Sequence, residues 1–229
     1  MNHSEKGQIP SKLLNKKSLD YMLFISLIQV AYLAAFATMH SLLASKQFKD
    51  FAWRVFGPEM MDRWYMTFYT VFAAISFLPL AVMLLLFPGQ MLYVIPSPWR
   101  WLMVGVQLLS AAWIVKGFTD SPHRFSISQQ LSKSEEAKPL IPRGVYCYVR
   151  DPFLISGLLG MWLTPFMTTM LLVTYLLSSL YLYLGSLHWE TRLLAQFGKE
   201  YVDYQKKLPR AIPWKGSQCP WIYKKCERK

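Results

Sequence analysis

The sequence has little charge, and acidic residues are especially few. Only 17% of its 229 residues are charged, and 13 Asp and Glu stand against 25 Lys and Arg. Soluble domains typically carry about 25% charged residues. Disorder over most of the chain is excluded, because nine Trp, 13 Tyr and 14 Phe are far too many for a disordered sequence. With a hydrophobic fraction of 53%, the composition predicts a small, basic, polytopic membrane protein.

The motifs of soluble-enzyme, metal and nucleic-acid chemistry are also missing. We find no P-loop, no Gly-x-Ser-x-Gly and no His-Glu-x-x-His pattern. The cysteines, Cys147, Cys219 and Cys226, do not have metal-ligand spacing, so we predict no metal site and expect reduced thiols on a cytosolic side. The net charge of +12 falls on no recognisable nucleic-acid module, so we predict no nucleic-acid partner.

Apolar blocks predict membrane-spanning helices, since a helix needs about 20 apolar residues to cross the hydrocarbon core. The blocks are 21–39, 64–87, 98–118 and 152–187. As a single helix the last block would be about 54 Å long, and Pro165 favours a break within it. We therefore predict a helical hairpin with a short arm, 152–164, and a full arm, 166–187. The expected fold is an all-α integral membrane protein with about five transmembrane helices.

The chain is expected to form one membrane domain, 1–229. Its parts are a polar N-terminal tail (1–19), three spans (20–118), a cytosolic segment (119–151), the hairpin (152–187) and a cytosolic C-terminal segment (188–229). Most of the 25 cations then lie on one side, and the positive-inside rule places that side in the cytosol and the N-terminus outside. The first span also resembles a signal peptide at residues 35–37, but its length favours an uncleaved anchor.

The most informative motif runs from Gly144 to Pro152 and leads directly into the hairpin. It reads Gly-Val-Tyr-Cys-Tyr-Val-Arg-Asp-Pro, and the hairpin exit at 187–192 reads Leu-His-Trp-Glu-Thr-Arg. A hairpin returns its chain to the side that it left, so polar groups at 143–151 and 188–192 are expected to meet at one membrane surface. This arrangement predicts a pocket with one wet, charged wall and one lipid-facing wall.

This motif and the residues up to Pro213 resemble the isoprenylcysteine carboxyl methyltransferase superfamily, which includes phospholipid methyltransferases. The family pattern is Gly-x-Tyr-x-x-x-Arg-His-Pro-x-Tyr-x-Gly, a hairpin, Glu-Glu-x-x-Leu, Phe-Gly-x-x-Tyr-x-x-Tyr and two prolines. The chain matches it at Gly144, Tyr146, Arg150, Pro152, Glu190, Phe197, Gly198, Tyr201, Tyr204, Pro209 and Pro213. Residues 40–45, 61–65 and 164–168 look like the methanethiol S-methyltransferase and nurim-like branch.

The resemblance implies a membrane enzyme that binds S-adenosylmethionine at the cytosolic face and methylates a small thiol or lipophilic acceptor. By position, the implied cofactor-binding residues are Lys138, Pro139, Leu140, Ile141, Tyr146, Asp151, Pro152, Phe153, Leu154, Trp189 and Glu190. Arg150 and Glu190 are the candidate catalytic residues, and His40 and Arg192 are candidate substrate contacts. A cytosolic C-terminal helix is expected to cap the pocket, and the other expected partners are membrane lipids.

Departures from the family pattern leave other interpretations open. Asp151 replaces the family histidine, Leu154 the following tyrosine, and Trp189 the first glutamate of the pair. These changes are compatible with a non-catalytic membrane protein that keeps the fold but has lost the cofactor. A weaker alternative is a haem or quinone protein that uses His40 and His188.

Individual residues also have two interpretations each. Glu190 fits either a cofactor contact or an ion pair with the cations beside it. Trp189 and Tyr148 fit either a cation–π contact with a sulfonium or an interfacial aromatic belt.

Overall fold

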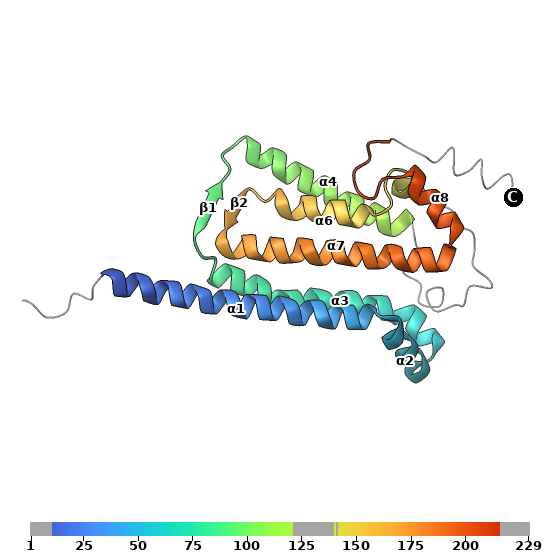
Figure 1. Cartoon of the computed structure of the whole chain (residues 1–229), viewed down its shortest axis with the longest axis horizontal. Coiled ribbons are helices and arrows are strands. Elements are labelled where there is room, and N and C mark those ends of the chain that lie inside the picture. The colour runs from blue at the N-terminus through green and yellow to red at the C-terminus, as the bar shows by residue number, and fades with distance from the viewer. Residues whose placement is uncertain (1–10, 121–139, 141, 216–229) are drawn as a thin grey trace, which may run out of the picture.

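The protein is a bundle of long α-helices that run side by side in a computed structural model (Figure 1). The structure describes residues 11–120, 140 and 142–215. The helices are α1 (Ser11–Ala44), α2 (Lys46–Phe56), α3 (Pro58–Leu86), α4 (Trp99–Asp120), α6 (Pro152–Trp162), α7 (Thr169–Phe197) and α8 (Lys199–Lys207). Two short strands, β1 (Met91–Val94) and β2 (Phe166–Thr168), and the 3-10 helix η3 (Gly144–Cys147) complete the described elements.

Four of these helices are long and apolar enough to cross a membrane: residues Asp20–Ala44 of α1, and α3, α4 and α7 in full. Their large apolar side chains face outward, as Leu27 (68% exposed) and Leu85 (80% exposed) illustrate. A water-soluble bundle would bury such side chains, whereas lipid covers them in a membrane. The predicted all-α integral membrane fold is therefore confirmed, and the chain is a multi-pass membrane protein.

The hairpin predicted over 152–187 is present, but its arms differ in length from the prediction. The short arm is α6, which ends at Trp162 and is too short for a span. The long arm is α7, which continues to Phe197 and ends where Gly198 adopts a φ of 50°. In the view of Figure 1, α6 lies between α4 and α7, and it packs against both.

The tip of the hairpin contains a strand that the sequence did not predict. Strand β2 pairs antiparallel with β1, with Met91 opposite Thr168 and Val94 opposite Phe166. The segment that follows α3 therefore meets the hairpin tip. The pairing satisfies backbone groups of both segments at this end of the bundle.

The opposite end of the bundle gathers α2, η3 and α8 (Figure 1). The predicted C-terminal helix is present as α8, and Tyr201 and Tyr204 on it pack with Leu208 in a buried cluster. The polar groups at 143–151 and 188–192, which were expected to meet, lie together at this end, as the contact between Arg150 and Glu190 shows.

Candidate functional site

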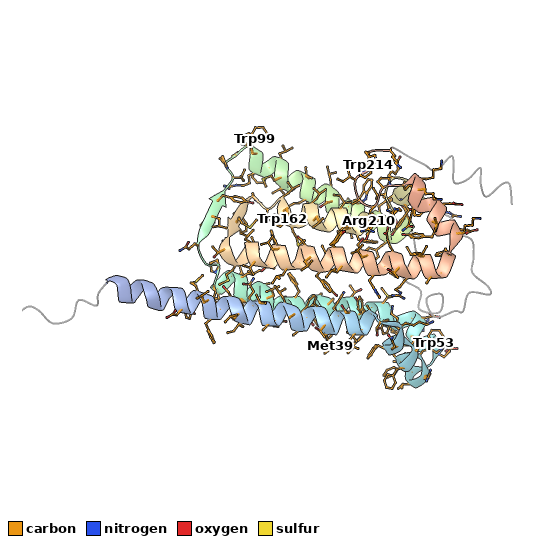
Figure 2. The ribbon with its side chains drawn as sticks, viewed as in Figure 1. Met39, Trp53, Trp99, Trp162, Arg210 and Trp214 are labelled. Atoms are coloured by element: carbon orange, nitrogen blue, oxygen red, sulfur yellow. The ribbon has the colours of Figure 1, made fainter. Side chains whose placement is uncertain are left out.

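Glu190, on α7, is the centre of a buried ionic cluster at the end of the bundle that carries α8. Its Oε1 accepts a hydrogen bond from Nη1 of Arg150, and its Oε2 accepts one from Nη2 of Arg210. The Tyr201 hydroxyl also lies 3.4 Å from Oε1. Only 7% of the Glu190 surface is exposed. We call Arg150, Glu190 and Arg210 the Glu190 clamp; Figure 2 shows the position of Arg210.

Backbone hydrogen bonds reinforce the clamp. The amide of Arg150 donates to the carbonyl of Pro209 at 3.0 Å, and the amide of Asp151 donates to the carbonyl of Arg210 at 2.8 Å. Nε of Arg150 donates to the carbonyl of Leu208 at 3.0 Å. The segment after α8 is thus fastened both to the corner that precedes α6 and to α7.

The charges of the clamp favour an anionic ligand. Two guanidinium groups share one carboxylate, which leaves one positive charge in excess. Burial alone would lower the pKa of Arg210, but hydrogen bonding to Glu190 and its charge raise that pKa above the ordinary value, so Arg210 stays protonated. Burial, and then the charge of Glu190, raise the pKa of Tyr201 to about 12, so its hydroxyl remains a donor.

Asp151, which stands where the family has histidine, caps the N-terminus of α6. Its Oδ1 accepts hydrogen bonds from the amides of Phe153 and Leu154, both at 3.2 Å. Pro152 occupies the first turn, where its missing N–H costs nothing. Asp151 is 5% exposed, and the positive end of the helix dipole stabilises its negative charge. This departure from the family pattern therefore has a structural role of its own.

Tyr146, in η3, is held at both ends. Its carbonyl accepts a hydrogen bond from the hydroxyl of Tyr204 at 2.7 Å, and its own hydroxyl donates to the carbonyl of Gly117 in α4 at 3.3 Å. Its exposed fraction is 8%. The tyrosine of the predicted motif therefore links α8, η3 and α4.

Gly144 is required by both conformation and space. Its φ is +54°, and a Cβ built on it would lie 1.8 Å from Oδ2 of Asp120. The same oxygen accepts a hydrogen bond from the amide of Val145 at 2.9 Å. The glycine thus lets η3 approach the end of α4 closely.

The structure describes only some of the other residues that were predicted to bind the cofactor. The amide of Leu140 donates to Oε2 of Glu200 at 3.2 Å, which places Leu140 beside α8. Lys138, Pro139 and Ile141 lie outside the described residues. On α7, the guanidinium of Arg192 lies over the Trp189 ring, 5.2 Å from its centroid. Trp189 is thus already engaged by a cation of the protein.

His40 lies in a separate polar cluster, between α1, α3 and α7. Its Nε2 hydrogen-bonds with the hydroxyl of Tyr69, and its ring lies 6.2 Å from that of Tyr181 on α7. Within the described chain, Nδ1 has no hydrogen-bond partner. Tyr181 and Glu190 are nine residues apart, which is about two and a half helical turns. They therefore point to opposite faces of α7, and the structure does not bring His40 to the Glu190 clamp.

The haem alternative is not supported by the positions of its histidines. His188 is seven residues beyond Tyr181, so it lies about 10 Å further along α7 than the ring that neighbours His40. Two axial ligands of one iron would have to converge on a point between them. Among the described residues, no group of three metal-ligating side chains is present.

Two features of the site were not predicted. Arg210 lies between Pro209 and Pro213, which both match the family pattern. Its place between these prolines is the one feature of the sequence that could have indicated a role for it. Cys147 is fully buried and disulfide-bonded, so the expectation of a reduced thiol is wrong for this residue. Cys219 and Cys226 lie outside the described residues.

Comparison with known proteins finds relatives named methanethiol S-methyltransferase. The protein of that name from Crocosphaera subtropica is 28% identical over 221 residues, which cover 90% of this chain and 82% of the relative. The protein from Pseudomonas deceptionensis is 29% identical over 196 residues, with 82% and 72% covered. The protein from Mycobacterium tuberculosis is 24% identical over 199 residues, with 82% and 78% covered. No family model and no solved structure matches the chain. The resemblance predicted from the motifs is thereby confirmed.

Proposed function

We propose that the protein is an integral-membrane methyltransferase that uses S-adenosylmethionine to methylate a small thiol. The observation that carries the proposal is the convergence of Tyr146, Arg150 and Glu190 at one end of the bundle, in a chain similar over most of its length to methanethiol S-methyltransferases. The names of those relatives indicate the thiol rather than a prenylated protein cysteine as acceptor.

The described residues fit the polar part of such a cofactor. The excess positive charge of the Glu190 clamp suits the carboxylate of its amino-acid moiety. Asp151, whose Oδ1 caps α6, would supply a negative charge for the ammonium group of the same moiety. The remaining proposed cofactor contacts are Leu140, Tyr146, Pro152, Phe153, Leu154 and Trp189, together with Lys138, Pro139 and Ile141 of the neighbouring segment.

Methyl transfer to a thiolate requires little acid–base catalysis by the protein. When bound, the cofactor would supply an activated methyl group to a thiolate sulfur of the acceptor, and the electron pair of the broken methyl–sulfonium bond would stay on the cofactor sulfur. A thiol that has already lost its proton to water requires no general base. The residues of the site then contribute by orienting the reactants and excluding water. In this proposal Arg150 and Glu190 act by holding the corner before α6 in place.

His40 and Arg192 remain the proposed substrate contacts. Both lie on the side of α7 that faces α1 and α2, because Tyr181 and Arg192 are eleven residues, or about three turns, apart. This side is opposite to Glu190 on α7, so in this proposal the two residues contact the acceptor along its approach and not at the point of methyl transfer.

We also propose that the end carrying α2, η3 and α8 faces the cytosol and that the N-terminus lies outside. The support is the distribution of Lys and Arg, most of which belong to segments at that end.

Methyl transfer by proteoliposomes tests the proposed function. The purified full chain would be supplied with methyl-labelled S-adenosylmethionine and with methanethiol, longer alkyl thiols, phospholipids or a prenylcysteine analogue. We expect labelled thioether from the small thiols, with little label in the other acceptors. Absence of transfer to every acceptor would overturn the proposal, and preferred transfer to prenylcysteine would overturn the assignment of the substrate.

A second candidate is a non-catalytic membrane protein of the same fold. It is favoured by the occupation of both Glu190 oxygens by arginines and by the cation over Trp189. It predicts a folded protein that binds neither S-adenosylmethionine nor S-adenosylhomocysteine. Cofactor binding therefore separates the two candidates without knowledge of the acceptor.

A further inference from the structure

Helix α2 exposes an apolar stripe at the end of two candidate spans. Phe51 is 62% exposed and Val55 is 57% exposed. Because successive residues of an α-helix are about 100° apart, these two side chains lie about 40° from each other on one side of the helix. Lys46, Asp50 and Arg54 occupy the adjoining side, within an arc of about 80°. The outer surface of α2 is thus divided into a charged part and an apolar part.

The orientation of α2 is fixed by its inner face. Ala52 is buried with Met61 and Tyr65 of α3, and Phe48 and Trp53 pack against this cluster. A helix held in this way cannot rotate to bury Phe51 or Val55 against the bundle. The exposed stripe is therefore a fixed property of the folded chain.

Both ends of α2 are fixed as well. At its start, the hydroxyl of Ser45 accepts a hydrogen bond from the amide of Phe48 at 3.2 Å. At its end, Gly57 has a φ of 78° and Pro58 begins the next helix. The helix therefore makes two defined corners with its neighbours.

The place of α2 in the fold is at the boundary of the membrane. The span in α1 ends at Ala44 and the span in α3 begins at Pro58, so α2 joins two spans at one surface. Its 11 residues are about 16 Å long, too short to cross the hydrocarbon core. Figure 1 shows α2 turned away from the common direction of α1 and α3, and Figure 2 shows Trp53 at this end of the molecule.

We propose that α2 lies in the membrane interface and binds phospholipid. Phe51 and Val55 enter the boundary between headgroups and acyl chains, while Lys46 and Arg54 contact the phosphate groups. This is the arrangement of an amphipathic helix in the interface, with apolar burial supplying the affinity and cations adding attraction to anionic lipids. The helix thereby sets the depth at which α1 and α3 emerge from the membrane. The proposal is independent of the proposed function, because it involves no residue of the Glu190 clamp.

Lipid-depth quenching of the full chain in vesicles tests this proposal. An environment-sensitive fluorescent amino acid would be incorporated at position 51, 55 or 54, and the vesicles would contain phosphatidylcholine brominated near the top of the acyl chains. Quenching at positions 51 and 55 is expected to be about twofold or more stronger than at position 54, with blue-shifted emission. Equal quenching at the three positions, or accessibility of position 51 to aqueous iodide, would overturn the proposal. Blue-shifted emission that brominated lipid does not quench would also overturn it, since protein would then cover the stripe.

Two further experiments separate the contribution of the apolar side chains to lipid binding from the contribution of the cations. In a chain labelled at position 55, Phe51→Glu should lower lipid quenching while the unfolding midpoint stays near that of the labelled parent, and Phe51→Leu is the matched control. In a chain labelled at position 51, replacing phosphatidylcholine partly by phosphatidylglycerol should increase the quenching. The variant K46Q with R54Q should lose most of that increase, and an increase that persists would overturn the role of the two cations.

Discussion

The guanidinium of Arg210 and the carboxylate of Glu190 form an ion pair that fastens the segment after α8 onto α7. Arg150 occupies the other oxygen of the same carboxylate, so one side chain holds two segments that are 60 positions apart in the chain. Glu190 therefore has a structural role in holding these two segments together.

Replacing Glu190 with Gln should strongly destabilise the end of the bundle. The variant would leave two partly buried guanidinium groups facing each other with no counter-charge, and breaking such a pair costs about 3 kcal/mol. Thermal unfolding in detergent measures the loss. Glu200→Gln is the matched control, since it also removes a carboxylate from this end of the molecule, and it should cost about 1 kcal/mol or less. Equal midpoints for Glu190→Gln and wild type would contradict the clamp.

The role of Asp151 as a helix cap predicts different results for two substitutions. Asp151→Ala should lower the free energy of unfolding by about 1 kcal/mol, whereas Asp151→Asn keeps an acceptor oxygen and should lose only a few tenths. Denaturant titration distinguishes them. If Asn costs as much as Ala, the negative charge matters more than the hydrogen bonds to the helix.

Gly144→Ala should displace η3 from α4. The new Cβ would clash with the Asp120 carboxylate, and the φ of +54° is strained for alanine, so a loss of about 2 kcal/mol or more is expected. Gly185→Ala in α7 is the control, because nothing lies within 4 Å of its Cβ and alanine favours the helix. The two unfolding midpoints should shift in opposite directions, and a stabilising Gly144→Ala would show that η3 does not need this glycine.

Because of Lys49, the free energy of unfolding should depend on pH in the alkaline range. Burial, together with the nearby charge of Arg192, lowers the pKa of Lys49 from 10.5 to about 8. Between these values the unfolded chain retains a proton that the folded chain has released, so the free energy of unfolding rises with pH. Below about 8 both states are protonated and the full cost of burying the charge remains. Lys49→Met should stabilise the protein at neutral pH and flatten this rise, and an unchanged slope in the variant would contradict the assignment.

The spans could be predicted because they depend on composition over about 20 consecutive residues. The strand pair could not, because β1 and β2 are short, lie more than 70 positions apart, and show no alternation of buried and exposed residues along Met91–Val94. Helix α2 was missed for a related reason. Its 11 residues are rich in charge, so composition alone does not distinguish this helix from a polar loop between two spans.

The site was predicted in part for similar reasons. The motif placed Tyr146, Arg150 and Glu190 at one surface, and the structure brings Arg150 and Glu190 into contact. Whether Glu190 would bind a ligand or another side chain remained open, since its partners are set by the path of the chain after α8. Arg210 illustrates the same limit, because its contact with Glu190 depends on the backbone pairing of residues 150–151 with 209–210.

The central claim is that this end of the bundle binds S-adenosylmethionine, and calorimetric titration of the purified full chain with S-adenosylhomocysteine tests it most directly. We expect saturable binding at a single site, weakened by Tyr146→Ala in a variant shown to be folded, and unaffected by the exposed control Phe51→Leu. Absence of any binding heat at millimolar ligand, with wild-type protein that unfolds cooperatively, would contradict it.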